Sequence, residues 1–143
     1  MTFDGITTRA IIHELKQSLE GGAIKKINQI GPKQLTLQIY ANKTNQQLYL
    51  SADSSTARFH LSNQKYTNPR TPPNFVMLLR KHIGQARLES IDQVTLDRTV
   101  CFTFKTHNEL GDQVEKYLIV EIMGKHSNII LLDENKKVLD AIQ

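Results

Sequence analysis

The stretch VEKYLIVEIMGKHSNIILLD, residues 114–133, is the most apolar part of the chain and decides its fold. Between residues 117 and 123 the side chains alternate with a period of two and many are β-branched, which predicts a central strand buried at least partly on both faces. A polar turn at residues 124–128 interrupts it before an apolar run resumes at residues 129–133. The stretch is therefore expected to form a β-hairpin.

One carboxylate, Glu121, stands among the apolar residues of the first predicted strand. Because a buried carboxylate loses hydration, we expect it either to be paired or to have a polar role. The turn that follows contains Lys125, His126, Ser127 and Asn128. Such residues are typical of an ordinary solvated turn. They also suit a contact surface, so the spacing alone leaves both interpretations open.

The composition is that of a globular domain with its own core. The chain has 143 residues, of which 39% are hydrophobic and 22% charged, and this fits one domain. It contains no apolar run of membrane-spanning length and no recognisable secretion signal, so we expect a cytoplasmic protein without membrane contact. The single cysteine, Cys101, excludes an internal disulfide and is expected to be a packed thiol. Strand-like alternation still runs at residues 137–143, which predicts the N-terminal fragment of a longer multidomain protein.

Charge is distributed unevenly along the chain. Residues 1–90 carry 12 Lys and Arg against 5 Asp and Glu, whereas residues 91–143 carry 6 against 9. Residues 21–88 hold ten basic side chains and one acidic one, Asp53, a field that attracts polyanions. Aromatic residues are interleaved with these cations: Tyr40, Tyr49, Phe59, Tyr66 and Phe75. They suit stacking on unpaired nucleobases, although Phe59 and Phe75 are expected to lie in the core. A nucleic-acid surface and an ordinary solvated basic face both remain open.

The first half of the chain predicts one helix followed by an antiparallel meander. Apolar residues recur at helical spacing over residues 7–20, with Thr7 or Thr8 as a candidate cap and Gly21-Gly22 as the end of the helix. Residues 62–74 are polar, contain three prolines and lack periodicity, so they predict a long loop with Tyr66 and Arg70 as candidate contacts. Between helix and loop, alternating runs predict four strands, at residues 23–30, 35–41, 47–52 and 57–61.

The second half predicts another helix and another meander. The helix covers residues 74–83 and stops at Gly84, and Arg80 and Lys81 in its last turn suit the helix dipole as well as a phosphate. A strand at residues 99–104 then leads towards the hairpin. The predicted fold class is therefore α+β, an antiparallel β-sandwich of two meanders with flanking helices.

The sequence contains no recognisable catalytic motif. Its five histidines lack metal-ligand spacing, and there is no nucleophile elbow, phosphate-binding glycine loop or dinucleotide fingerprint. We therefore expect a binding module rather than an enzyme, with no metal and no cofactor. The pair Asp97-Arg98 remains a candidate site, since Arg98 can meet a phosphate or a guanine edge while Asp97 accepts from a base amine. A surface ion pair is the competing interpretation.

Several segments together resemble the N-terminal domain of the NFACT family. They are FDG (3–5) with TRA (8–10), FVMLLRKH (75–82), LDR (96–98), NELGD (108–112) and EIMGKHSN (121–128). The resemblance spans essentially the whole chain, and its bacterial branch, the RqcH proteins, is also described as fibronectin-binding protein A-like. It implies a ribosome quality-control factor that binds the stalled large ribosomal subunit with its peptidyl-tRNA. It further implies recruitment of alanyl-tRNA for C-terminal alanine tailing of the nascent chain.

The resemblance also implies roles for particular residues. The family's Asp-Arg pair, concerned with tRNA, falls on Asp97 and Arg98. Its Glu-Ile-Met-Gly-Arg patch falls on residues 121–125, where Lys125 replaces the usual arginine, keeping the charge but losing the bidentate fork. The expected partners are the large ribosomal subunit, alanyl-tRNA, peptidyl-tRNA and later domains of the same chain. Together with the basic half of the chain, the resemblance gives these further expected RNA or ribosome contacts: Arg9, Arg80, Lys81, Arg87, Glu121, Met123, Lys125, His126 and Asn128.

The family domain in turn resembles the N-terminal β-rich domain of formamidopyrimidine-DNA glycosylases. Those enzymes act through an N-terminal proline, which the opening Met1-Thr2-Phe3-Asp4 lacks, so this resemblance implies the fold and not the glycosylase chemistry. Two alternatives stay open. One is a fibronectin-binding adhesin, which the missing secretion signal disfavours, and the other is a non-catalytic glycosylase-like domain that binds nucleic acid.

Overall fold

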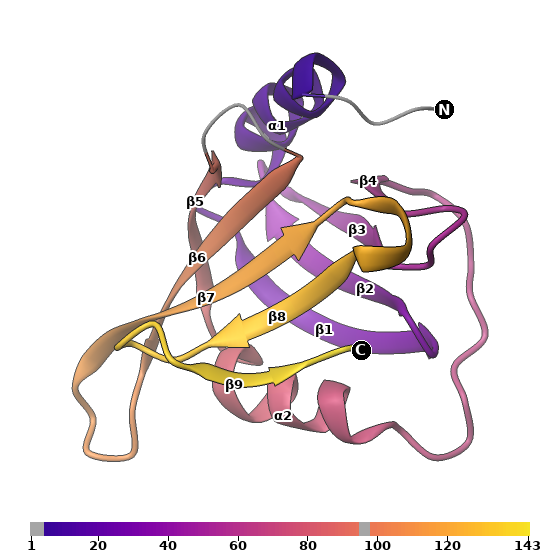
Figure 1. Cartoon of the computed structure of the whole chain (residues 1–143). Helices are drawn as coiled ribbons and strands as arrows, with labels where there is room; N and C mark the ends of the chain where they lie inside the picture. Colours follow the sequence, from indigo (N-terminus) through magenta and orange to yellow (C-terminus); the bar gives the residue numbers. More distant parts are fainter. Residues whose placement is uncertain (1–4, 95–97) are drawn as a thin grey trace.

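In the computed structural model, which describes residues 5–94 and 98–143, nine antiparallel strands and two α-helices form the fold (Figure 1). In chain order the elements are α1 (Gly5–Leu19), β1 (Ala23–Gly31), β2 (Gln34–Ala41), β3 (Thr44–Ser51), β4 (Arg58–Leu61), α2 (Asn74–Ile83), β5 (Arg87–Gln93), β6 (Thr99–His107), β7 (Gln113–Glu121), β8 (Asn128–Leu132) and β9 (Val138–Ala141). A 3-10 turn, Gly124–His126, connects β7 to β8. The predicted α+β class and both meanders are confirmed.

The two meanders belong to one sheet. Its strand order is β4-β3-β2-β1-β5-β6-β7-β8-β9. β1 and β5 share a single ladder pair, Ala23 opposite Arg87. Beside it, the Leu88 amide donates to the Gly22 carbonyl (2.8 Å) and the Leu88 carbonyl accepts from the Gly21 amide (2.7 Å). The predicted β-sandwich of two meanders is therefore corrected to one continuous sheet, because the two meanders are hydrogen-bonded edge to edge.

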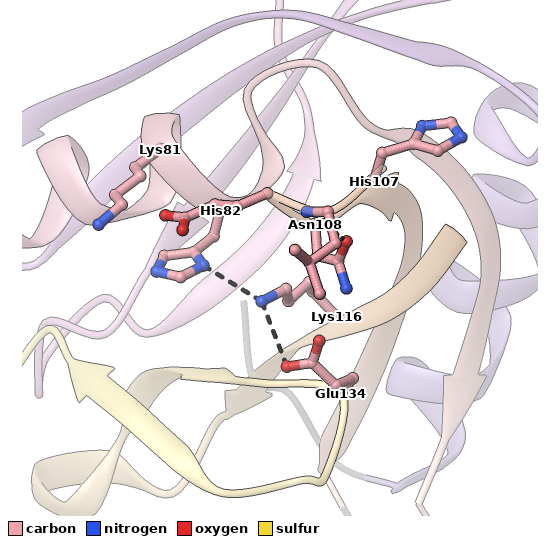
Figure 2. A pocket seen from close by; sticks show the side chains of 8 residues that line it. Lys81, His82, His107, Asn108, Lys116 and Glu134 are labelled. Atoms are coloured by element: carbon pink, nitrogen blue, oxygen red, sulfur yellow. Dashed lines mark hydrogen bonds and ion pairs between the residues drawn. The ribbon is translucent and has the colours of Figure 1, made fainter. Parts of the chain in front are cut away.

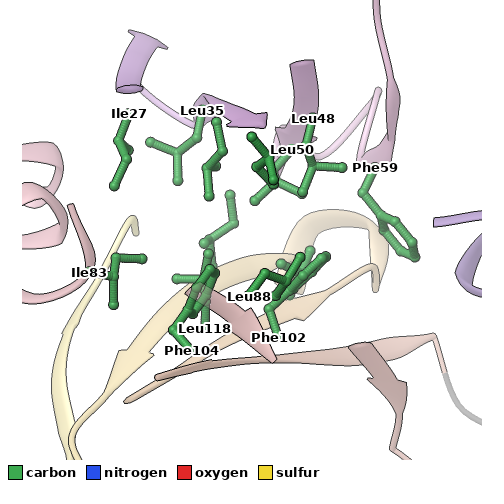
Figure 3. Close-up of a cluster of buried hydrophobic side chains, with 14 of the residues drawn as sticks. Ile27, Leu35, Leu48, Leu50, Phe59, Ile83, Leu88, Phe102, Phe104 and Leu118 are labelled. Atoms are coloured by element: carbon green, nitrogen blue, oxygen red, sulfur yellow. The ribbon is translucent and has the colours of Figure 1, made fainter. Parts of the chain in front are cut away.

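The core lies between the two halves of this sheet, which folds over on itself. A fully buried Leu or Phe side chain contributes roughly 1.5–3 kcal/mol, so the apolar contacts hold the halves together much more strongly than the short β1–β5 junction. In Figure 3, buried side chains of the first meander (Ile27, Leu35, Leu48, Leu50) face those of the second (Leu88, Phe102, Phe104, Leu118).

Two glycines make the junction possible. Gly21 follows α1 with a φ of +87°, a left-handed conformation that ends a helix and favours glycine. A Cβ added to Gly22 would lie 2.6 Å from Cγ2 of Ile39 and 2.9 Å from the carbonyl oxygen of Leu19. The Gly21-Gly22 pair thus ends the first helix and lets β1 pass close to its neighbours.

The two helices lie at opposite ends of the folded sheet (Figure 1). Their buried faces are Ile12, Leu15 and Leu19 of α1 and Phe75, Val76, Leu79 and Ile83 of α2. α1 begins at Gly5, so Thr7 and Thr8 lie inside the helix and the predicted cap at either residue is wrong. Neither helix in the described part of the chain is long and apolar enough to cross a membrane.

The predicted hairpin is confirmed as β7 and β8, with Glu121 opposite Asn128. β7 lies between β6 and β8, but β5 is the middle strand of the sheet, so β7 is an interior strand rather than the central one. Leu118 and Val120 of β7 are buried in the core, whereas Glu121 is half-buried. Alternation along the strand therefore carries the Glu121 carboxylate to the face opposite the core.

Candidate functional site

Arg98 and the connection between β7 and β8 lie at the same end of the sheet. Arg98 directly precedes β6, and its carbonyl accepts a hydrogen bond from the amide of Ile122, just past the end of β7 (2.9 Å). We call Arg98 together with residues 121–128 the rim. Asp97, the other half of the predicted pair, lies outside the described residues.

A buried serine shapes the turn of the rim. The Ser127 hydroxyl accepts a hydrogen bond from the Met123 amide (2.8 Å), and the Ser127 amide donates to the Gly124 carbonyl (3.1 Å). Gly124 has a φ of +59°, in the left-handed region that favours glycine. These features close the 3-10 turn and leave Lys125 and His126 exposed.

The predicted contact residues of the rim differ in what their side chains do. Arg98, Met123, Lys125 and His126 are exposed. The side chain of Asn128, in contrast, accepts from the Gln143 amide (3.2 Å) and donates to the Gln143 carbonyl (3.3 Å). Asn128 therefore ties the rim to the residues after β9. This structural role depends on a contact between distant parts of the chain and has no local sequence signal.

The basic residues predicted around the second helix have separate surroundings. Arg80 donates to a backbone carbonyl of β1 (2.8 Å) and to the side chain of Asn28 (3.0 Å). Arg87 donates to a backbone carbonyl between α1 and β1 (2.6 Å), whereas Lys81 lines a pocket on another side of α2. Arg9 is exposed on α1. Each of the four thus remains a separate predicted contact.

The pocket beside Lys81 has a volume of about 410 Å3 and is lined by α2 and by the turns that follow β6 and β8 (Figure 2). Lys116 of β7 reaches into it, with Nζ 3.3 Å from Nδ1 of His82 and 3.5 Å from Oε1 of Glu134. The Lys116 side chain is only 9% exposed. Because a buried charge needs a partner, the ion pair with Glu134 compensates for part of its lost hydration.

Burial and the neighbouring Lys116 ammonium lower the pKa of His82 below its ordinary value. The imidazole is then neutral at pH 7, and its Nδ1 accepts a hydrogen bond from Lys116. Lys116 is not among the residues that the sequence predicts as contacts. A signal was present, because Lys116 lies two residues before Leu118 on the core side of β7 and alternation predicts its inward direction.

Nucleophilic chemistry has little support in the described residues. Cys101 lies half-buried on β6, and burial raises the pKa of its thiol, which favours a packed thiol over a reactive thiolate. In residues 5–94 and 98–143, no three His, Cys, Asp or Glu side chains are grouped so as to hold a metal ion. The rim instead presents cationic and hydrogen-bonding groups, which suit the binding of an anionic partner.

Comparison with known proteins finds relatives over nearly the whole chain. Residues 4–143 match the family model described as NFACT N-terminal and middle domains. The chain is 47% identical to the Rqc2 homolog RqcH of Bacillus subtilis over 139 residues, which are 97% of this chain and 24% of the relative. It is 32% identical to ribosome quality control complex subunit 2 of Saccharomyces cerevisiae, over 90% of this chain and 12% of that protein.

Solved structures share the fold. The chain superposes on the crystal structure of the N-terminal domain of the fibronectin-binding protein PavA from Streptococcus pneumoniae with a TM-score of 0.96 and 43% identity, covering 99% of this chain and 54% of that one. The chain therefore spans about a quarter of the length of the Bacillus subtilis relative and about half of the solved chain. Since the family model matches it from residue 4 to residue 143, the chain belongs to the NFACT family.

Proposed function

We propose that this chain is the tRNA- and ribosome-binding module of a ribosome quality-control factor. The relatives that support this are the RqcH of Bacillus subtilis and subunit 2 of the yeast ribosome quality control complex. The single observation that carries the proposal is the hydrogen bond from the Ile122 amide to the Arg98 carbonyl. It brings Arg98, the described residue of the LDR segment, and the segment EIMGKHSN to one end of the sheet.

The side chains of the rim suit an RNA partner. Arg98 offers a planar guanidinium that can bind a phosphate or a guanine edge through two parallel hydrogen bonds. Lys125 supplies a second cation, and His126 adds an imidazole that can stack on a base or donate to a phosphate. Asp97 would accept from a base amine next to Arg98. The cations of the rim would therefore supply affinity, and the Asp97-Arg98 pair would supply selectivity.

The remaining partners follow from the same proposal. The factor would act in the cytoplasm on the large ribosomal subunit that retains peptidyl-tRNA, and it would recruit alanyl-tRNA for alanine tailing. The chain spans about a quarter of the RqcH relative. Later domains of the full-length protein would therefore share the ribosome contact, and this module would supply a tRNA contact.

Purification of the full-length protein from cells, with sequencing of the bound RNA, tests this proposal. We expect large-subunit rRNA together with a tRNA population enriched in alanine acceptors. Recovery of the subunit without any enriched tRNA would contradict the tRNA part of the proposal. Recovery of neither RNA would contradict both parts. A damaged DNA duplex that displaces tRNA would favour the glycosylase-like nucleic-acid-binding domain instead.

Fibronectin binding is a second candidate function, because the similar solved domain comes from a protein named for that activity. An adhesin must also reach the cell surface. Surface labelling of intact cells, combined with binding of the full-length protein to immobilised fibronectin, tests this candidate. Saturable binding by protein that is labelled at the surface would support it, whereas protein protected from the label would exclude an adhesin role.

A further inference from the structure

We propose that the outer face of β1–β3 is a second RNA-contact surface, which binds a short unpaired RNA segment. The inference rests on the proposed function for the class of partner, but it concerns a face that the rim does not include. We call this face the amide groove and define it by Lys26, Asn28, Gln38, Gln47, Lys65 and Tyr66, which line one pocket of about 530 Å3.

Alternation in the strands builds the floor of the amide groove. Lys26 of β1 is paired with Gln38 of β2, and Gln38 is paired with Gln47 of β3, so the three side chains form a row across the sheet. The neighbouring row, which contains Leu37 and Leu48, is fully buried in the core. Because successive residues of a strand point to opposite faces, the polar row lies on the outer face.

The amide groove continues towards α2. A pocket of about 310 Å3 adjoins it through Lys26 and Asn28, and a third of about 190 Å3 adjoins the second through Asn28 and Arg80. Among the described residues that line these three pockets, every charged side chain is a cation and none is Asp or Glu. An extended polyanion can therefore follow the groove without meeting a like charge.

An ordered aromatic ring borders the amide groove. Tyr66 stacks on Tyr49, with ring centroids 5.5 Å apart and planes inclined by 21°. The Tyr66 hydroxyl is 2.9 Å from the hydroxyl of Ser62. The Gln47 side-chain amide donates to the carbonyls of Ser62 (3.2 Å) and Gln64 (2.9 Å), which holds this part of the loop against β3. Tyr66 is thus a preorganised platform on which a nucleobase can stack.

The chemistry of the amide groove favours RNA over an acidic peptide. Cations alone satisfy the carboxylates of a peptide. Here, Gln38 adds a half-buried side-chain amide that carries both donors and an acceptor and lines the groove. Such a group can pair with the edge of an unstacked base, while Tyr66 stacks on its face and Lys26 and Lys65 neutralise phosphates. A duplex keeps its bases stacked on each other and cannot use Tyr66 in this way.

The test measures binding of the full chain to a fluorescent unpaired RNA of about 12 nucleotides, which covers the usual range of site sizes. A double variant, Lys26→Gln with Lys65→Gln, removes two cations of the amide groove. The matched control, Lys105→Gln with Lys137→Gln, removes two cations elsewhere. We expect the plot of log affinity against log salt concentration to lose about 1.4 of its slope in the groove variant, from two phosphate contacts on a single strand. The control should keep the slope of the unmodified chain.

A second pair of variants tests the aromatic contact. Tyr66→Ala should weaken binding of the unpaired RNA about 5-fold or more, because one stacked base is lost. Tyr66→Phe keeps the ring, loses only the hydroxyl contact with Ser62 and should bind as the unmodified chain does. Circular dichroism checks that each variant is folded.

The outcomes separate this inference from the proposed function. If the groove variants bind the unpaired RNA like the unmodified chain while Arg98→Ala still reduces tRNA retention, the inference is overturned and the proposed function stands. If Arg98→Ala has no effect but the groove variants lose RNA binding, the amide groove stands and the rim assignment fails. If the lysine variants lose polyglutamate and RNA equally and Tyr66→Ala changes neither, the face is an acidic-peptide surface and the inference is overturned.

Discussion

The backbone amide of Ile122 donates a 2.9 Å hydrogen bond to the carbonyl of Arg98. This bond joins the residue before β6 to the residue after β7, so the Arg98 backbone is held beside the connection that contains the turn Gly124–His126. The side chains of Arg98 and Lys125 take no part in the bond. They can therefore be replaced to test RNA binding without removing the contact that holds the rim together.

Replacing Gly124 with alanine should perturb the turn of the rim. A left-handed residue with a side chain costs roughly 1–2 kcal/mol, and no heavy atom lies within 4 Å of a Cβ at this position, so the cost is conformational only. We expect the unfolding free energy to fall by about 1 kcal/mol and RNA binding to weaken as Lys125 and His126 shift. Denaturant titration and filter binding measure the two effects.

Gly111→Ala is the matched control for that variant. Gly111 also has a positive φ and open surroundings, but it lies in the turn between β6 and β7, away from the rim. It should lose similar stability and keep RNA binding. Equal loss of binding in both variants would mean that Gly124 acts through stability alone.

Gly22→Ala should be more damaging to the fold than either of these. Its Cβ would meet Ile39 and the backbone of Leu19 at less than van der Waals distance. Overpacking of this kind costs typically about 1–3 kcal/mol, and it would push β1 away from its neighbours at the β1–β5 junction. An unchanged denaturation midpoint would show that the junction tolerates a side chain and does not depend on close approach.

The lowered pKa of His82 predicts a pH dependence of stability. Unfolded His82 binds a proton at higher pH than folded His82, so the free energy of unfolding should decrease as the pH falls below about 6.5 and should be insensitive to His82 above that value. His82→Asn keeps an acceptor for Lys116 and cannot titrate. Denaturant titrations at pH 7.5 and 5.5 should therefore show a smaller loss for the variant than for the unmodified chain.

Asp53 and Asp133 should not affect stability between pH 7.5 and 5.5. A hydroxyl from Ser55 lowers the pKa of Asp53, and a backbone N–H from Lys137 lowers that of Asp133. Their stabilisation is present above their unfolded pKa values of about 4 and is lost only at more acidic pH. The same loss between pH 7.5 and 5.5 in His82→Asn and in the unmodified chain would mean that His82 is not the group responsible.

Local sequence patterns accounted for most of the strands, because alternation reports directly which face of a strand is buried. The start of β3 differs from the predicted residue 47. The turn after β2 is only Asn42-Lys43, both with positive φ, so β3 already begins at Thr44. The junction of β1 with β5 was not predictable in this way. The junction depends on the close approach of Gly22 to Ile39 of β2. Local sequence patterns do not report this contact, because the two residues and β5 are far apart in the chain.

The same distinction applies to the site. The turn in residues 121–128 is predicted from its local sequence, whereas its role as a contact surface is predicted from the family resemblance. The roles of Asn128, which binds Gln143, and of Lys116, which contacts His82, arise only when distant segments meet. The amide groove is intermediate. Its polar residues alternate visibly in the sequence, but their alignment across three strands requires the register of the sheet.

A triple variant in which glutamine replaces Arg80, Lys81 and Arg87 should bind RNA or the ribosome more weakly. Its binding should also depend less on salt concentration. The expected change in slope is about 1 for each residue that contacts a phosphate. Because Arg80 also donates to β1 and Asn28, the single variants should be compared by melting temperature. An unchanged salt slope would reduce these residues to structural cations of α2 and its surroundings.

The proposed function assigns tRNA selection to Asp97 and Arg98. The decisive measurement is the tRNA retained by full-length protein that carries Asp97→Ala and Arg98→Ala, taken together with its melting temperature. An exposed charged residue such as Arg98 contributes at most about 1 kcal/mol to stability, whereas a specific contact to a base is worth roughly 1–3 kcal/mol. We therefore predict a nearly unchanged melting temperature, retained association with the large subunit, and loss of selective tRNA recovery. A large fall in melting temperature, with tRNA retention no lower than unfolding explains, would contradict the claim and make the pair structural.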